Sequence, residues 1–203
     1  MFLEISEKDI DLCVKIMQNE DILSFPTETV YGLGVIFDSP KAFEKLCELK
    51  RRPPEKPFGM MFSLLDEAAH YIDVEKKGLS LMKAFLPGEI TFLVKAKSSL
   101  PWHVTLGTGV VGVRIPNKAS LLELIKALGK PILQTSANRS GEKTLSSYED
   151  VAKEFGEEIP GIVKGECVSK TPSTIVSLVK DNVELIREGS VPFSEVERIW
   201  RSL

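Results

Sequence analysis

The sequence lacks several features that would place it in a specialised protein class. Its 203 residues include only three cysteines, Cys13, Cys47 and Cys167, and no Cys-x-x-Cys pair. This pattern excludes a disulfide framework and a cysteine-based zinc site, and it is typical of small core residues in a reducing cytosol. No run of about 18 apolar residues occurs, so we expect no membrane span. The N-terminus lacks the basic-then-apolar layout of a secretory signal, so we expect a cytoplasmic protein.

The sequence also lacks a strong excess of charge of either sign. It has 26 Lys and Arg against 29 Asp and Glu, a net charge of −3. This balance argues against a protein whose main role is to coat nucleic acid. The charge is unevenly distributed, however, because residues 41–57 carry six Lys and Arg but only three Glu. One basic patch on a mildly acidic body favours a small anionic ligand over a polyanion.

The hydrophobic patterns predict one α/β domain. No internal repeat or low-complexity linker divides the chain, and a chain of this size hides roughly 70% of its unfolded surface. Because predicted helices alternate with apolar strands, we expect them to surround one twisted sheet. The predicted helices cover residues 10–17, 40–50, 79–86, 120–128, 148–155 and 195–203, and the predicted strands cover 21–25, 58–64, 90–94, 110–114, 131–135, 174–178 and 183–187.

Residues 24–34, SFPTETVYGLG, form the most informative segment. The triplet Thr27, Glu28 and Thr29 places hydrogen-bond donors and acceptors beside Gly32 and Gly34. Glycine lets a backbone approach a ligand closely, so the segment indicates a binding site. The alternative interpretation is structural: a strand that ends in a proline-initiated turn capped by threonine.

A cationic segment, KRRPPEKP, follows at residues 50–57. A predicted helix ends in three cations, and two prolines hold the next residues extended. Such a loop suits a polyphosphate, because Arg forks match phosphate oxygens and Lys acts as a point charge. The competing interpretation is a solvated, charged helix end.

Three further segments carry polar residues next to apolar strands. Arg114 interrupts the apolar run at 110–115, where it either snorkels or pairs with an anion. The cluster QTSANRSG at 134–141 follows a buried strand, and ligands of open α/β sheets collect beyond strand ends. The hydroxyl-rich 171–176 and the Arg-Glu-Gly of 187–189 flank the last two strands. The residues alone thus predict an α/β domain with a polar, partly cationic anion site.

Together and in order, these segments resemble the signature of the YrdC family of L-threonylcarbamoyladenylate synthases. The matching segments are residues 25–34, 50–53 with 56–57, 87–88 with Thr91, 113–116, 136–141, 172–176 and 185–189. The resemblance covers residues 8–190. It implies a single YrdC-like domain over 1–203, with a twisted mixed sheet and flanking helices around a large concave cavity, and no additional C-terminal domain.

The resemblance implies an enzyme, a nucleotidyltransferase. L-Threonine and bicarbonate or CO2 would give N-carboxylated threonine, whose carboxylate attacks the α-phosphorus of ATP. The products would be threonylcarbamoyl-AMP and pyrophosphate. A separate tRNA threonylcarbamoyl transferase complex would then modify adenosine 37 of tRNAs that read ANN codons. The implied cofactor is Mg²⁺, arriving with ATP and without a metal site on the protein, and weak tRNA binding is also expected.

The resemblance assigns roles to individual residues. The implied catalytic residues are Lys50, Arg52 and Arg114. The implied ATP-binding residues are Lys50, Arg52, Lys56, Val110, Ser136, Asn138, Thr144 and Arg187. The implied threonine-binding residues are Thr29, Met61, Arg114, Gln134 and Ser173. Met61 and Val110 depart from the family pattern, so Met61 is expected to give only apolar contact and Val110 only backbone groups.

Two other functions fit parts of the sequence. An RNA-binding module could use a basic rim of the cavity, but the net charge disfavours it. A related domain of hydrogenase maturation transfers carbamoyl groups, but such domains usually sit in long chains with zinc fingers. The absence of Cys-x-x-Cys pairs argues against that alternative.

Overall fold

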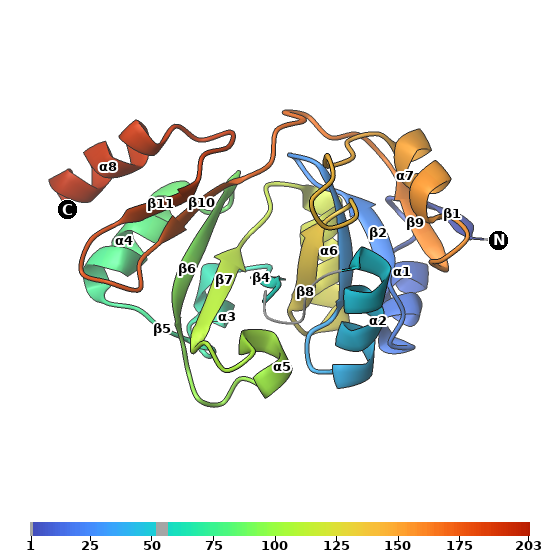
Figure 1. Cartoon of the computed structure of the whole chain (residues 1–203), viewed down its shortest axis with the longest axis horizontal. Helices are drawn as coiled ribbons and strands as arrows, with labels where there is room; N and C mark the ends of the chain where they lie inside the picture. The colour runs from blue at the N-terminus through green and yellow to red at the C-terminus, as the bar shows by residue number, and fades with distance from the viewer. Residues whose placement is uncertain (1, 52–56) are drawn as a thin grey trace.

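The computed structural model describes residues 2–51 and 57–203. Within these residues, eleven strands form one mixed sheet with helices around it (Figure 1). This confirms the predicted α/β class. In sheet order the strands are β1 (Leu3–Ser6), β9 (Gly161–Lys164), β2 (Leu23–Pro26), β3 (Tyr31–Ile36), β8 (Ile132–Ser136), β4 (Gly59–Met61), β7 (Val110–Arg114), β6 (Ile90–Ala96), β10 (Thr174–Ser177) and β11 (Glu184–Arg187), while β5 (Ile72–Asp73) pairs with β6.

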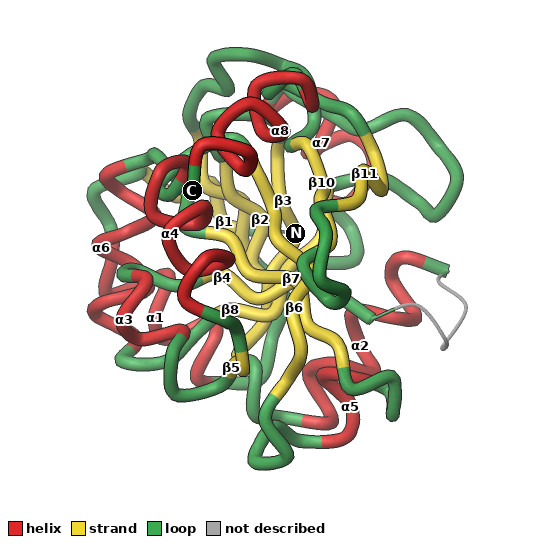
Figure 2. Tube along the Cα trace, turned by 90° about the vertical axis from the view of Figure 1, so that its left-hand side faces the viewer, coloured by secondary structure: helices red, strands yellow, loops and turns green. Residues whose placement is uncertain are grey.

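Helices cover the sheet on its outside, and the strands run through the middle of the molecule (Figure 2). They are α1 (Ile10–Gln18), α2 (Pro40–Lys50), α3 (Leu65–Ala68), α4 (Lys76–Phe85), α5 (Trp102–Thr105), α6 (Ala119–Leu128), α7 (Tyr148–Phe155) and α8 (Phe193–Ser202). α4 and α8 lie beside β10 and β11, whereas α1, α2 and α7 lie toward the other end of the sheet, where the N-terminus is (Figure 1). Among the described helices, none is both long and apolar enough to cross a membrane.

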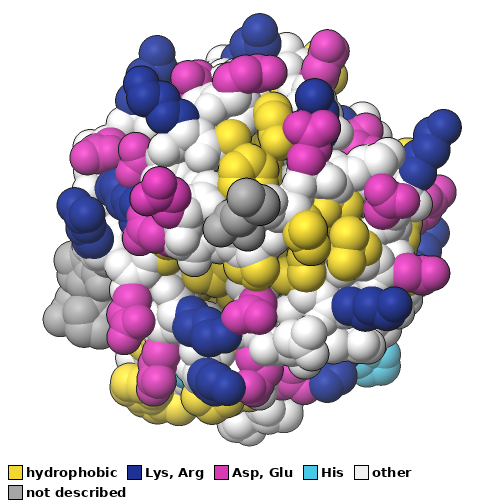
Figure 3. All heavy atoms as spheres, turned by 90° about the vertical axis from the view of Figure 1, so that its right-hand side faces the viewer, with side chains coloured by type: hydrophobic (Ala, Val, Ile, Leu, Met, Phe, Trp, Pro, Cys, Tyr) yellow, Lys and Arg dark blue, Asp and Glu magenta, His cyan; other side chains and the backbone are white. Residues whose placement is uncertain are grey.

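Two hydrophobic clusters hold these layers together. The larger one joins α2, α4, α7 and α8 to the sheet, and its largest side chains include Tyr31, Phe62 and Phe92. The smaller one packs α1 and α6 together against β2 and β8, with Phe25 and Ile132 on the sheet side. On the face that carries the N-terminus, basic and acidic side chains are interspersed around apolar patches (Figure 3).

The helix boundaries follow from local chemistry. The Ser39 hydroxyl accepts a hydrogen bond from the Ala42 amide at 3.1 Å, and Pro40 occupies the first turn of α2. Gly129 ends α6 with a φ of 68°, a left-handed conformation that glycine adopts without steric cost. Both the cap and the stop match the sequence prediction.

Strand prediction was less complete. The predicted strand 58–64 is only Gly59–Met61, and the sequence prediction missed β1, β3, β5 and β9. β3 was missed because Gly32 and Gly34 weaken its strand pattern. Residues 24–34, the predicted binding segment, therefore contain a hairpin. In it, β2 and β3 pair antiparallel around a tight turn at residues 27–30.

The glycines of β3 make room for an aromatic ring. A Cβ atom added at Gly34 would lie 2.6 Å from Cε1 of Phe25 and 2.7 Å from Cγ2 of Ile132. At Gly32 the added atom would lie 2.9 Å from Cε2 of Phe25. The glycines between larger residues in segment 24–34 therefore leave room for the Phe25 ring to pack in the smaller cluster.

We predict that Gly34→Ala lowers the free energy of unfolding by about 1–3 kcal/mol, because the new methyl overpacks a filled core. Urea unfolding followed by circular dichroism measures this. The exposed Ser98→Ala serves as control and should change stability by less than about 0.5 kcal/mol. Equal stability of both variants would show that the Phe25 ring moves aside freely.

Candidate active site

A pocket of about 260 Å³ opens on the sheet between its two ends. Strands β3, β8, β4, β7, β6, β10 and β11 all contribute to its wall, so residues far apart in sequence meet there. The lining residues are Thr27, Val30, Tyr31, Gly32, Pro57, Phe58, Gly59, Thr91, Leu93, Val110, Gly112, Arg114, Gln134, Thr135, Ser136, Pro172, Ser173, Ile175 and Arg187.

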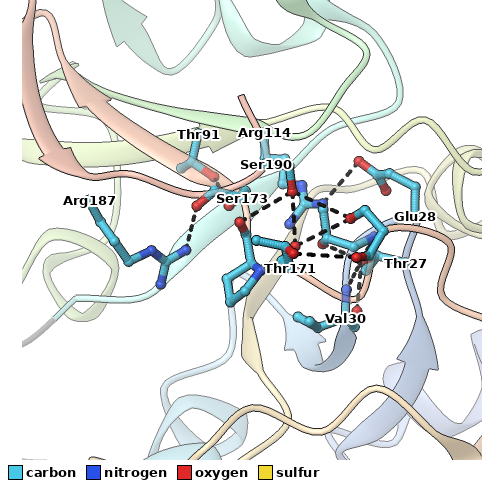
Figure 4. Close-up of polar contacts among 12 residues, drawn as sticks. Thr27, Glu28, Val30, Thr91, Arg114, Thr171, Ser173, Arg187 and Ser190 are labelled. Carbon is cyan, nitrogen blue, oxygen red and sulfur yellow. Dashed lines mark hydrogen bonds and ion pairs between the residues drawn. The ribbon is translucent and has the colours of Figure 1, made fainter. Parts of the chain in front are cut away.

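Arg114 reaches this pocket from the C-terminal end of β7. Its side chain is only 5% exposed, and its Nη2 donates to Glu28 Oε1 at 2.9 Å and to Thr29 Oγ1 at 2.8 Å (Figure 4). The sequence left open whether Arg114 snorkels or pairs, and the structure shows that it pairs. Since both Nη2 hydrogens are used, a ligand carboxylate meets one arm of the fork rather than both.

The turn between β2 and β3 fixes the partners of Arg114. Thr27 Oγ1 accepts from the amides of Thr29 and Val30 at 3.0 and 3.2 Å and donates to the Val30 carbonyl at 2.7 Å. It also shares a 2.8 Å hydrogen bond with Thr29 Oγ1. Threonine favours this bonding to nearby backbone, which explains the Thr-Glu-Thr spacing. The predicted structural turn and the predicted binding site therefore coincide.

A second cation, Arg187 of β11, lines the opposite side of the pocket. Its Nη2 donates to the Ser173 carbonyl at 2.6 Å, and no described carboxylate pairs with it. Burial, and secondly the charge of Arg114, lower the pKa of Arg187 from its usual value. Near it, the hydroxyls of Thr91 and Ser173 share a 3.1 Å hydrogen bond (Figure 4). This side therefore offers a positive charge and two hydroxyl groups to a ligand.

Lys50, at the end of α2, is buried rather than free in solvent. Its Nζ donates to the Ser136 carbonyl at 2.6 Å, to Asn138 Oδ1 at 2.9 Å and to the Asn138 carbonyl. Three acceptors match the three hydrogens of an ammonium group. Lys50 thus helps to hold the loop after β8 in place, and its predicted contact with a triphosphate stays a prediction.

Asn138 is occupied in the same way. Its Nδ2 donates to the carbonyls of Arg139 and Glu142, each at 2.8 Å, and its Oδ1 also accepts from Ser136 Oγ at 2.7 Å. Both hydrogens of the Asn138 side-chain amide are therefore used within this loop, and its predicted role in ATP binding stays a prediction. Ser136 itself lines the pocket, as do Val110 and Gln134.

The remaining predicted residues fall into three groups. Ser173 lines the pocket, and Thr29 bonds to Arg114 just behind the wall. Thr144 lies half-buried between β8 and α7 and is absent from the pocket lining. Arg52 and Lys56 lie outside the described residues, so their roles stay predictions.

Met61, a predicted threonine-binding residue, is absent from the pocket lining. Gly59 of β4 lines the pocket, whereas Met61 lies two residues further along the strand, level with Arg114 of β7 and Ile132 of β8. Its side chain is fully buried in the smaller cluster with Phe25. Its predicted apolar contact with threonine stays a prediction.

The sequence prediction missed two residues that build the site. Tyr31 lines the pocket and donates its hydroxyl to the Gly165 carbonyl at 2.8 Å, and burial raises the pKa of Tyr31. Glu28 is the ionic partner of Arg114. Both residues belong to segment 24–34, which the sequence indicated as a binding site. A sequence motif, however, does not show which partner a side chain contacts.

We predict that Lys50→Met destabilises the ligand-free protein by at least about 2 kcal/mol, because buried acceptors lose their donor. Hydrogen exchange at the Ser140 amide, which donates to the Lys50 carbonyl, should accelerate. Lys130→Met is the control: it removes an ammonium that contacts Asp38 on the surface, a pair worth about 0–1 kcal/mol. Unchanged exchange and stability in Lys50→Met would contradict the structural role.

The chain is similar to several known proteins. It is 31% identical over 200 residues to the threonylcarbamoyl-AMP synthase of Bacillus subtilis, covering 97% of this chain and 58% of that protein. Its structure matches P. abyssi Sua5 complexed with L-threonine, with a TM-score of 0.92, 28% identity, and coverage of 98% of this chain and 60% of that one. It also matches E. coli YciO, with a TM-score of 0.87, 27% identity, and coverage of 95% and 97%.

The chain thus spans about three fifths of the first two relatives. The curated names support an enzyme of the nucleotidyltransferase type. The Sua5_yciO_yrdC family model, described as "Telomere recombination", matches residues 15–189. This match spans most of the sequence, and the chain therefore belongs to the Sua5/YciO/YrdC family.

Proposed function

We propose that this protein makes threonylcarbamoyl-AMP and pyrophosphate from L-threonine, bicarbonate or CO2, and ATP. The observation that carries the proposal is the meeting of two arginines, Arg114 and Arg187, in one hydroxyl-lined pocket. The names of the Bacillus relative and the threonine complex of P. abyssi Sua5 support the same chemistry. The product would serve the threonylcarbamoylation of adenosine 37 in tRNAs reading ANN codons, through a separate transferase complex.

The amino acid is proposed to bind at the Arg114 end. One arm of the guanidinium would hold the threonine carboxylate, since charge-assisted hydrogen bonds are the strongest available there. The pocket volume of about 260 Å³ lies just below the range of typical ligand sites, which span roughly 300–1,000 Å³. It therefore suits the amino-acid part of the reaction, with the nucleotide extending from the Arg187 side.

The proposed reaction needs no covalent intermediate with the protein. The threonine nitrogen forms a bond to the carbon of CO2 and loses a proton, which gives a carbamate. A carbamate oxygen then attacks the α-phosphorus, and pyrophosphate leaves. The protein contributes alignment of the two reactants and neutralisation of charge, which supply most of the catalysis in such transfers.

Mg²⁺ is proposed to enter with ATP. Among the described residues no group of three or more His, Cys, Asp or Glu side chains could hold a metal ion. The phosphate oxygens and several water molecules would supply its ligands, as is usual for Mg²⁺ at nucleotide sites. Bound in this way, the ion would neutralise part of the phosphate charge.

We predict that the protein releases pyrophosphate from ATP only when threonine is present. The test is one incubation with ATP, Mg²⁺, threonine and bicarbonate, followed by phosphate detection after pyrophosphatase and by mass spectrometry of the adenylate. Threonine should be needed because the pocket pairs a carboxylate-binding arginine with hydroxyl groups. Equal turnover with serine, with glycine or with no amino acid would refute the assignment to threonine.

We further predict that Arg187→Gln weakens the binding of a non-hydrolysable ATP analogue about tenfold or more, since a hydrogen bond to a charged group is worth roughly 1.5–3 kcal/mol. Calorimetric titration measures this loss. The exposed Arg198→Gln on α8 is the matched control and should bind the analogue normally. The same affinity in both variants would remove Arg187 from the nucleotide site.

A further inference from the structure

Glu28 is a buried carboxylate for which the proposed reaction has no role. It is absent from the pocket lining, and its side chain is 7% exposed, close to the 5% of its partner Arg114. Groups of both signs are rarely buried without a reason, because removing each from water is costly. The reason must lie in what Glu28 does to Arg114.

The backbone of Glu28 is held in place by a segment that is distant in the sequence. Its carbonyl accepts hydrogen bonds from the amides of Val168 and Ser169, at 3.1 and 3.0 Å. These residues belong to the segment 165–173, which crosses from β9 to β10 and contributes Pro172 and Ser173 to the pocket. With its main chain held in this way, the Glu28 carboxylate reaches Arg114 from a set position (Figure 4).

The hydrogen-bonding groups of the pair show which part of Arg114 serves a ligand. Nη2 is used by Glu28 and Thr29. Arg114 Nε and Glu28 Oε2 are both buried and have no hydrogen-bond partner among the described residues. Glu28 thus accepts one hydrogen bond from a guanidinium group that can donate two to a carboxylate. Nη1 is the nitrogen that remains for the pocket.

The charges give the consequence for binding. Among the described lining residues, Arg114 and Arg187 are the charged ones. Glu28 compensates Arg114, so a ligand carboxylate approaching Nη1 is attracted by the guanidinium and repelled by Glu28 at short range. A ligand that carries an ammonium next to its carboxylate escapes this penalty, because Glu28 attracts the ammonium. These opposing effects are stronger than in bulk water, because both Glu28 and Arg114 are buried.

We propose that Glu28 is a positioning residue that acts through Arg114 and makes the pocket select an α-amino acid zwitterion over a simple carboxylate anion. Its carboxylate aims Nη1 at the pocket and cancels the charge of the guanidinium. The choice of an amino acid as ligand rests on the proposed function, whereas the rejection of simple carboxylates does not.

The test measures acetate binding to the ligand-free protein by NMR titration. In Glu28→Gln the shape is kept and the charge is lost, so acetate should bind at least about tenfold more tightly than to the wild type, a difference of 1.4 kcal/mol. Glu154→Gln is the matched control. Glu154 Oε1 lies 2.7 Å from Nε of Arg139, and neither residue lines the pocket. It should leave acetate affinity unchanged. Equal acetate affinity in Glu28→Gln and the wild type would overturn the proposal.

A double variant tests whether Glu28 acts through Arg114. In an Arg114→Gln background, adding Glu28→Gln should raise acetate affinity by less than it does in the presence of Arg114, because the donor that Glu28 orients is gone. A gain of tenfold or more in that background would mean that Glu28 acts on the ligand independently, and would overturn the positioning role.

A wild-type comparison needs no variant at all. L-Threonine should bind at least about tenfold more tightly than 3-hydroxybutanoate, which keeps the carboxylate and hydroxyl but lacks the ammonium. Equal affinity for the two would overturn the proposed selectivity. If threonine does not bind but acetate tightens in Glu28→Gln, the proposed function fails while the role of Glu28 stands.

Discussion

The buried ion pair between Arg114 and Glu28 links two separate parts of the sheet beside the pocket. Arg114 comes from β7, and Glu28 comes from the turn between β2 and β3, on the far side of β8 and β4 in the sheet order. A buried pair adds little net stability, because desolvation offsets the attraction, but losing one partner is costly. The pair therefore also specifies one arrangement of these strands, and the segment 165–173 adds to this by donating hydrogen bonds to the Glu28 carbonyl.

The three cations near the pocket differ in how far the protein already satisfies them. Lys50 donates to three acceptors, which makes it part of the framework. Arg114 already uses one of its two terminal nitrogens, Nη2, in hydrogen bonds to Glu28 and Thr29. Arg187 has one carbonyl partner and no described carboxylate. Because a ligand competes with existing partners, the order of availability is Arg187, then Arg114, then Lys50. Residue type alone would have ranked all three as equal anion binders.

The sequence predicted the fold class and the location of the site more fully than the geometry within the site. The Ser39 cap and the Gly129 stop depend on a few adjacent residues, so they could be predicted locally. β3 could not, because its strand conformation comes from pairing with β2 and β8 and from the Phe25 ring over its glycines. The burial of Met61 in the smaller cluster could not be predicted either, because alternation along a strand gives the face of a residue but not how far the pocket extends along that face.

Because Glu28 compensates the positive charge of Arg114, it also affects whether two ligands can bind together at so small a pocket. The charge of Arg114 already contributes to the lowered pKa of Arg187, so the two guanidinium groups affect each other. A simple carboxylate at Arg114 would add negative charge and reduce the pull of the pocket on a phosphate at Arg187. A zwitterion adds no net charge, so the attraction of Arg187 for phosphate persists when the first site is filled. In the proposed reaction, an amino acid and a nucleotide can then bind together, because Glu28 has already supplied the negative charge that Arg114 requires.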